Sequence, residues 1–193
     1  KLDYAKYLTA SLAYLALRQN DRVGLVCLNA AGGDRLPTRG GQRHLHSLLG
    51  MLEKIEARGT ANIGAALLHE AEGWRRRGLA ILISDLYGEP GEIVDAVARV
   101  RRAGHDLIIF HLLDLAEKEL SGSGVFEFRD LETGQVLVAD ADTIRHEYRE
   151  RLDASCKLYR QEFLLAGVDY CELDTSEPLD RSLALFLRHR RSG

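Results

Sequence analysis

The sequence predicts an α/β fold, built on an open and mostly parallel β-sheet with helices on both faces. Along the chain, the spacing of apolar residues switches repeatedly between a helical period and an extended one. The runs LAILIS and DLIIFHLLD are apolar almost throughout, which is typical of central parallel strands covered on both faces. No long Pro-, Gly- or Ser-rich linker interrupts the pattern, so residues 1–193 are predicted to form a single domain.

The first elements are predicted to be a helix and a β-hairpin. Leu2 to Arg18 carries an apolar stripe that widens until most of the helix surface is apolar, which indicates packing on two sides. Val23 to Asn29 is a short apolar run and is expected to be a strand. Asp34 to Thr38 follows Gly32-Gly33 and is expected to return antiparallel beside it, at an edge of the sheet.

The middle of the chain alternates helices and strands. Two helices are expected from Gln42 to Glu56 and from Asn62 to Arg76, followed by a strand from Leu79 to Ser84. A helix from Glu92 to Arg102 then precedes a strand from Asp106 to Asp114.

The last third adds an extra β-hairpin near residues 125–138. Val125 to Arg129 and Gln135 to Val138 flank a Gly-containing turn. A long helix from Asp142 to Ala166 ends at a glycine suited to a left-handed cap. Val168 to Leu173 is a final strand, and Ser176 followed by a proline is a good start for a final helix.

Composition excludes several classes of protein. Lys and Arg total 26 against 29 Asp and Glu, and the net charge of −3 gives no global attraction for nucleic acid. No run of about 18 apolar residues could span a bilayer. The three cysteines, Cys27, Cys156 and Cys171, show no metal-binding spacing, so we expect them to be buried as small hydrophobic side chains. Because no disulfide framework is indicated, we also expect a cytoplasmic location. The chain begins within a helix and without an initiator Met, so we expect an N-terminally truncated domain.

Enzyme motifs are absent from the sequence. GTANIGAAL lacks the Gly-Lys-Ser/Thr ending of a phosphate-binding loop, and neither GxSxG nor HExxH occurs. His111 lies in an apolar strand and is expected to be a buried, hydrogen-bonded residue rather than a catalytic base. The basic runs Arg75 to Arg77 and Arg188 to Arg191 are expected to be solvated or to cap helix C-termini, ahead of any role in binding nucleic acid.

Two polar residues lie where an α/β sheet binds ligands. Thr60 directly precedes a predicted helix and Asp85 directly follows the LAILIS strand, so both belong near the carboxyl edge of the sheet. Each residue also has a purely structural interpretation, Thr60 as a helix N-cap and Asp85 as a turn or cap carboxylate. We expect the two side chains to converge at that edge although they lie far apart in the sequence.

An ordered series of segments covers nearly the whole chain: KLDYAKYLTASLAYLALRQNDRVGLV, GTANIGAAL, LAILISDLYGE, GHDLIIFHLLDLAEKEL, FRDLETGQ and DTSEPLDRSLALFLRHRR. This series resembles the bacterial domain of unknown function fifty-eight family, a branch of the von Willebrand factor A-like (Rossmann-like) fold. The matching positions are Lys1, Asp21-Arg22, Ser84-Asp85, His105-Asp106, Asp114, Glu117 and Asp130-Glu132. Leu115 departs from the family pattern, which usually has proline there.

The resemblance implies strand order 3-2-1-4-5-6 and a metal-ion-dependent adhesion site at the carboxyl edge. Thr60 and Asp85 match two of its ligand positions, whereas the Asp-x-Ser-x-Ser loop and the first central strand would precede Lys1. We therefore expect the intact protein to bind Mg²⁺ or another divalent cation, and this fragment to bind none tightly. Without that first strand, the strand Leu79 to Ser84 must pair directly with Val23 to Asn29, or another segment must fill the gap.

The function expected from these features is that of a non-enzymatic protein–protein interaction module. The resemblance implies work beside a MoxR-type AAA+ ATPase in the assembly or maturation of a complex, with a membrane anchor upstream in some relatives. The alternative is a metal-dependent hydrolase using Asp85 and Asp114, since carboxylates at the ends of neighbouring strands can build phosphoryl-transfer sites.

Overall fold

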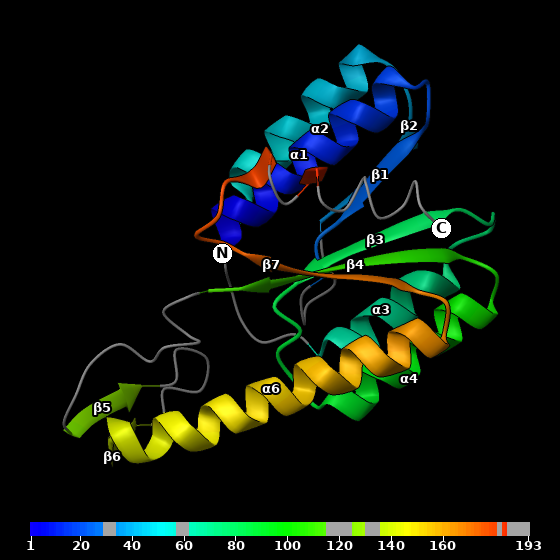
Figure 1. Ribbon diagram of the computed structural model, residues 1–193. Coiled ribbons are helices and arrows are strands. Elements are labelled where there is room, and N and C mark those ends of the chain that lie inside the picture. The colour runs from blue at the N-terminus through cyan, green and yellow to red at the C-terminus, as the bar shows by residue number, and fades with distance from the viewer. Residues whose placement is uncertain (29–33, 57–61, 115–124, 130–135, 181–182, 185–193) are drawn as a thin grey trace.

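A three-stranded parallel sheet lies at the centre of the computed structural model, in the order β3-β4-β7 (Figure 1). The strands are β3 (Leu79–Ser84), β4 (Asp106–Leu113) and β7 (Asp169–Asp174). All pairs run in register, with Ser84 opposite His111 and Leu113 opposite Asp174. The structure describes residues 1–28, 34–56, 62–114, 125–129, 136–180 and 183–184.

One face of this sheet is covered by α1 (Leu2–Arg18) (Figure 1). Leu8 is fully buried and packs in one cluster with Ile108, Phe110 and Leu112 of β4. The wide apolar stripe of the helix therefore has a partner on the sheet, which is the first of the two sides on which it was predicted to pack.

The opposite face is covered by three helices, α3 (Ile63–Glu72), α4 (Pro90–Arg102) and α6 (Ala141–Leu165) (Figure 1). Their largest shared cluster is the main core of the molecule. Its buried members are Ile63, Leu67, Leu82, Leu86, Ile93, Ala96, Val97, Val100, Leu107, Ile109, Tyr159, Phe163 and Val168. The prediction of helices on both faces of a parallel sheet is thus confirmed.

The first hairpin forms a small sheet of its own. β1 (Val23–Val26) pairs antiparallel with β2 (Arg35–Arg39), and α2 (Gln42–Lys54) packs beside α1 above them (Figure 1). The antiparallel return was predicted, but β1 ends at Val26 rather than at Asn29. Among the described strands, β1 is hydrogen-bonded to β2 alone, so the first of the two predicted alternatives, direct pairing of β1 with β3, is wrong.

Packing rather than backbone pairing joins the two sheets. α1 packs against the β4 side of the large sheet through Leu8, and against Leu48 and Leu52 of α2 through Ala13. Beyond the end of β1, Leu28 packs against the main core. The described strands nevertheless follow the expected order within each part, β1 beside β2 and β3 beside β4 and β7.

The second predicted hairpin is present as β5 (Val125–Arg129) and β6 (Val136–Asp140), which pair antiparallel. The helix expected to reach Arg76 stops earlier, because α3 is capped at Gly73 and the chain then turns so that Trp74 meets His105 edge to face. Most of the expected last helix lies outside the described residues. Of the helices the structure does describe, none combines the length and apolarity needed to cross a bilayer.

Candidate functional site

Three carboxylates lie at the carboxyl edge of the central sheet, where the parallel strands end together. Asp85 directly follows β3, Asp114 directly follows β4, and Asp174 is the last residue of β7. The N-terminal residue Lys1 reaches the same edge, with its Nζ 3.5 Å from Oδ2 of Asp85. This is the edge at which ligands bind in open α/β sheets.

The turn that follows β3 has a strained backbone. Leu86 has a φ angle of 49°, in the left-handed region, and only 4% of its surface is exposed. This conformation costs a bulky residue on the order of 1–3 kcal/mol, and such strain persists only where surrounding contacts enforce it. Ser84 supplies one such contact, because its Oγ accepts a hydrogen bond of 3.0 Å from the Leu86 amide.

Two side chains from other elements hold the same turn. Nε2 of His111 on β4 lies 3.0 Å from the Asp85 carbonyl oxygen and donates a hydrogen bond to it. The hydroxyl of Tyr159 on α6 donates to the Leu86 carbonyl oxygen at 3.3 Å. The turn is therefore fixed by groups from β3, β4 and α6 at once, and the backbone of Asp85 has little freedom to move.

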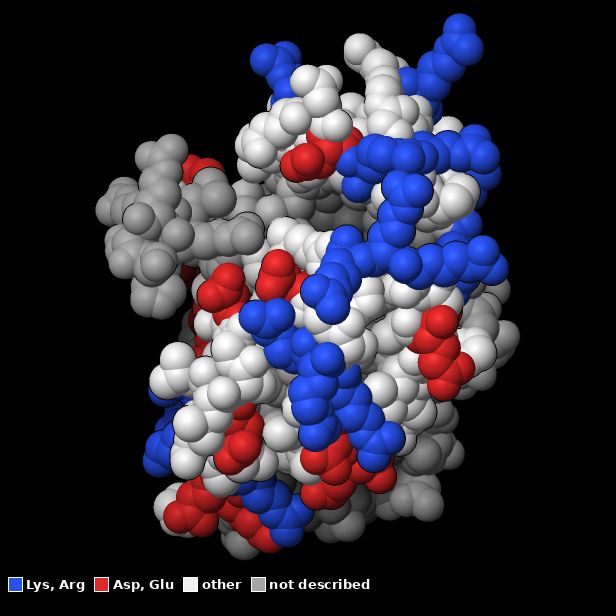
Figure 2. All heavy atoms as spheres, turned by 90° about the vertical axis from the view of Figure 1, so that its right-hand side faces the viewer, with Lys and Arg blue, Asp and Glu red and all other residues white. Residues whose placement is uncertain are grey.

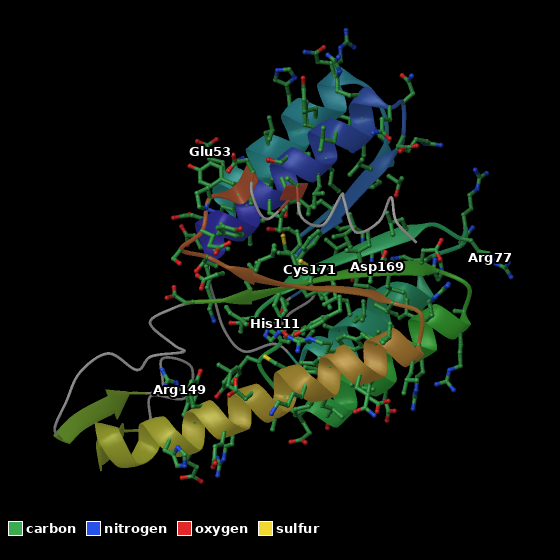
Figure 3. The ribbon with its side chains drawn as sticks, viewed as in Figure 1. Glu53, Arg77, His111, Arg149, Asp169 and Cys171 are labelled. Carbon is green, nitrogen blue, oxygen red and sulfur yellow. The ribbon has the colours of Figure 1, made fainter. Side chains whose placement is uncertain are left out.

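His111 lies on the α6 side of the sheet (Figure 3), where further polar groups hold it in turn. Its Nδ1 lies 2.6 Å from the hydroxyl of Tyr170, and that hydroxyl lies 3.2 Å from Oε1 of Glu172. Glu172 also accepts a hydrogen bond of 2.8 Å from Arg160. The chain of contacts runs from the exposed Arg160 to the buried imidazole and on to the Asp85 backbone.

Burial decides the protonation of His111 and Tyr170. It lowers the pKa of His111, an effect opposed by the hydrogen bond to the Asp85 carbonyl and by the charge of Glu172. Burial likewise raises the pKa of Tyr170, so the phenol keeps its proton. Because Nε2 of the neutral imidazole donates to Asp85, Nδ1 is an acceptor, and the single hydroxyl proton of Tyr170 is shared between Nδ1 at 2.6 Å and Oε1 of Glu172 at 3.2 Å.

Asp85 itself presents its carboxylate outward. Its side chain is 44% exposed, against 22% for that of Lys1. Two residues farther along, Tyr87 is 71% exposed. The edge thus combines a fixed backbone with a carboxylate, an ammonium group and an aromatic ring that a partner can reach.

The other two carboxylates serve the turn after β7. The hydroxyl of Thr175 donates to Oδ2 of Asp114 at 3.3 Å. The amide and hydroxyl of Ser176 both donate to Oδ1 of Asp174, at 2.9 Å and 2.6 Å. By the register of the sheet Asp85 stands level with Leu112, so Asp114 leaves the sheet about two residues, or ~7 Å, farther along.

The metal site implied by the resemblance is covered only in part. Thr60 lies outside the described residues, so its convergence with Asp85 stays a prediction; the N-cap of α3, however, is Asn62 and not Thr60. Within the described part of the chain, no group of three His, Cys, Asp or Glu side chains could hold a metal ion. Asp85, with a lysine beside it, does not by itself fit a cation that takes about six oxygen ligands.

Sequence reasoning missed the groups that hold the turn. Tyr159, Tyr170 and the strained Leu86 gave no local signal, because their roles depend on contacts between elements far apart in the sequence. His111 was predicted to be buried and hydrogen-bonded, which is confirmed by an exposure of 2% and two contacts. The described cysteines are buried or half-buried, and burial raises the pKa of both Cys27 and Cys171.

Comparison with known protein families gives one match over most of the chain. The family described as "Protein of unknown function DUF58" matches residues 1–157. Uncharacterized proteins of Mycobacterium tuberculosis and Mycobacterium bovis are each 26% identical to the chain over its full length. The chain spans 62% of the length of these relatives.

Two solved structures from Bacteroides show the same fold. A protein of Bacteroides fragilis described as an aerotolerance-related membrane protein has a TM-score of 0.55 and 19% identity, covering 95% of this chain and 85% of its own. The conserved hypothetical protein BatB of Bacteroides thetaiotaomicron has a TM-score of 0.55 and 15% identity, covering 98% and 87%. At these identities the likeness concerns the fold alone.

Proposed function

The chain belongs to the DUF58 family of proteins of unknown function, and on that premise we propose that it is a protein–protein interaction module. Its binding surface is the carboxyl edge of the central sheet, centred on Asp85. Tyr87 and Lys1 lie at the same edge and complete the surface.

The locked turn after β3 is the observation that carries this proposal. A bulky, buried residue, Leu86, is held at a positive φ by the hydrogen bond that its amide donates to Ser84 and by the one that its carbonyl oxygen accepts from Tyr159. Strain of this kind concentrates at binding and catalytic sites, where it fixes a group in advance of its ligand. Here the fixed group is the exposed Asp85, and a carboxylate fixed in advance loses little entropy on binding.

The geometry favours binding over hydrolysis. A hydrolase needs a general base free to activate water or a nucleophile. The nearest imidazole, that of His111, has one nitrogen on the Asp85 carbonyl and the other on Tyr170. The carboxylate of Asp114 accepts a hydrogen bond from Thr175. By the register of the sheet, Asp114 lies about two residues farther along the strand direction than Asp85.

The resemblance to the von Willebrand factor A-like fold supports two finer parts of the proposal. The first is that the partner is a MoxR-type AAA+ ATPase, with the module acting in assembly or maturation of a complex. The second is that a divalent cation strengthens the interaction in the intact protein, with Thr60 and Asp85 contributing to its site. Both parts rest on the family resemblance, and each has its own arm in the experiment below.

A binding measurement tests the proposal. The MoxR-type ATPase of the same organism is immobilised, and the affinity of the intact protein is measured by biolayer interferometry in Mg²⁺ and in EDTA. We expect Asp85→Asn to weaken binding about ten-fold or more, because a central charged contact is lost. Asp95→Asn removes an equal charge from an exposed position of α4 and should leave the affinity unchanged.

Two results would count against the interaction module. Equal affinities of Asp85→Asn and the wild type would remove Asp85 from the interface. Metal-dependent phosphoester hydrolysis that is lost in Asp85→Asn and kept in Asp95→Asn would favour the hydrolase instead.

A further inference from the structure

A band of basic side chains crosses the molecule at the end opposite the candidate site. Figure 2 shows Lys and Arg gathered down this face, with Asp and Glu on both sides of the band. The face corresponds to the amino edge of the central sheet, where Arg77 precedes β3 (Figure 3). It is a local feature, because the chain as a whole carries a net charge of −3.

Contacts between elements show that the band is continuous. Arg35 of β2 pairs with Glu70 of α3, and its Nη1 would lie 3.8 Å from a methyl group placed on Gly73. Arg77 follows Gly73 by four residues and lies close to Gly104, which comes directly after the last turn of α4. Its Nε would lie 2.8 Å from a methyl group placed on Gly104. We call the resulting surface the arginine stripe. Its members are Arg35, Arg75, Arg76, Arg77, Arg101 and Arg102.

Within the described part of the chain, acidic neighbours neutralise two members of the stripe. Arg35 pairs with Glu70, and Arg101 pairs with Asp106 at 3.0 Å. Between them, Arg75, Arg76 and Arg77 are exposed and make no hydrogen bond or ion pair with another residue that the structure describes. Three adjacent like charges repel one another, so their charges alone do not favour the folded chain.

Helix capping explains only part of the stripe. Arg101 and Arg102 lie in the last turn of α4, where cations interact favourably with the helix dipole. The run from Arg75 to Arg77 follows Gly73, the C-cap of α3, and the dipole effect falls off within the last turn. Of the two predicted roles, capping does not account for these three arginines, whereas their exposure to solvent is confirmed.

We propose that the arginine stripe binds an acidic segment of a partner protein, at a surface separate from the Asp85 edge. All six members are arginines, whose planar guanidinium groups pair with carboxylates through two hydrogen bonds. Acidic groups lie on both sides of the narrow stripe (Figure 2), and both Glu72 and Asp106, which are close to its members in the sequence, are exposed. An extended peptide can follow such a stripe, whereas a broad anionic bilayer would also meet the repelling carboxylates.

Nucleic acid fits this surface less well. Proteins that bind single strands combine basic grooves with aromatic rings on which bases stack. The aromatic residue next to the stripe, Trp74, is half-buried, and its ring packs edge to face on His105 with centroids 5.1 Å apart. The ring is thus already engaged inside the protein.

A defined acidic peptide tests the proposal without knowledge of the natural partner. Fluorescein-labelled octaglutamate is titrated with the protein, and anisotropy is followed at about 50 mM and about 300 mM salt. The triple variant Arg75→Gln, Arg76→Gln, Arg77→Gln should lose about ten-fold or more in affinity, and the wild type should bind more weakly at high salt. Arg75→Glu with Arg76→Glu, which leaves Arg77 against Gly104, should abolish binding.

A matched control removes the same charge elsewhere. Arg149→Gln, Arg151→Gln and Lys157→Gln lie on α6, and this triple variant should bind octaglutamate like the wild type. An equal loss of octaglutamate affinity in both triple variants would show that net charge alone causes the effect and would overturn the proposal. The absence of octaglutamate binding by the wild type would overturn it as well. Tighter binding of oligothymidylate, or of vesicles rich in anionic lipid, than of octaglutamate would assign the stripe to nucleic acid or to a membrane instead.

Discussion

A single imidazole connects the core of the molecule to its candidate binding edge. His111 is 2% exposed, and its two ring nitrogens contact the Asp85 carbonyl and the Tyr170 hydroxyl. Polar groups buried to this degree are costly unless both nitrogens find partners. The imidazole therefore positions the Asp85 turn and depends on its own neighbours to do so.

Replacing His111 should change both the stability and its dependence on pH. His111→Gln should cost about 1–3 kcal/mol of unfolding free energy at pH 7.5, because one or both buried partners lose a hydrogen bond. Burial lowers the pKa of His111 below its ordinary value of 6.5, so the unfolded chain binds more protons than the folded one as the pH falls below that value. The wild type should therefore lose stability on acidification, and His111→Gln should lose less.

Urea denaturation at about pH 7.5 and about pH 5.5 measures both effects. The groups that face His111 are Tyr159 on α6, Tyr170 and Glu172 on β7, and Lys1 with Asp85 at the edge. The control is His46→Gln, an exposed residue of α2 that should leave the pH dependence as it is in the wild type. An unchanged pH dependence in His111→Gln would show that the imidazole does not titrate with unfolding.

At this scale the sequence could place a residue on a strand, but it could not choose its partners. Asp85 was placed at the carboxyl edge because an apolar strand ends directly before it, and the structure places it there. Its contact with Lys1 and the clamp formed by His111 and Tyr159 were not foreseen, because they join residues 26 or more positions apart. Thr60 has no described position, so its role stays a prediction.

Helices α3 and α4 approach each other so closely that a glycine, which has no side chain, is needed where their backbones meet. A methyl group placed on Gly64 of α3 would lie 3.0 Å from the carbonyl oxygen of Glu92 at the start of α4. The same junction is tied by Asn62, which accepts a hydrogen bond from the Ala65 amide and donates one to the Glu92 carboxylate. The start of α3 is therefore held to the start of α4 both by close packing at Gly64 and by the hydrogen bonds of its N-cap, Asn62.

Two glycine substitutions should have opposite effects on stability. Gly64→Ala should lower the unfolding free energy by about 1–3 kcal/mol, because the clash is with backbone that cannot move aside. Gly50→Ala in α2 meets nothing within 4 Å and should raise it by about 0.5–1 kcal/mol through helix propensity. Equilibrium urea unfolding compares the two, and equal effects at both positions would contradict the close contact between α3 and α4.

Elements with a strong local pattern were predicted to within a residue or two, and those that depend on tertiary contacts were not. α1 and β3 have the expected bounds, because a helical stripe and an apolar run are read from neighbouring residues. α3 ends four residues before its expected limit, since Gly73 caps it and Trp74 turns toward His105. β1 is shorter than expected, and no local pattern marks where backbone pairing stops.

The arrangement of the whole molecule leaves β3 at an edge of its sheet. β3 pairs with β4 on one side, and no other described strand pairs with it. Its side chains are apolar, yet Leu79 and Ile81 are 46% and 38% exposed. The sequence predicted that β3 belongs to a central position, and an edge strand of this composition is prone to pair with another chain.

The position of the N-terminus indicates which strand would cover that edge. Lys1 lies at the carboxyl end of β3, and α1 then runs back across the face of the sheet on which Leu8 packs against β4. A segment directly before Lys1 that ran parallel to β3 would enter α1 through the right-handed crossover that such units adopt. In a polypeptide that carries residues before Lys1, we therefore expect the segment directly before it to pair with β3, between β3 and β1.

Hydrogen exchange followed by NMR measures this directly. In the present chain, alternate amides of β3 point away from β4 and should exchange quickly, whereas those bonded to β4 should be protected. In the extended polypeptide the outward amides should slow by about ten-fold or more, because each gains a backbone acceptor. The amides of β7, on the far side of β4, serve as the internal control and should not change. Fast exchange of the outward β3 amides in both polypeptides would show that the upstream segment does not pair with this edge.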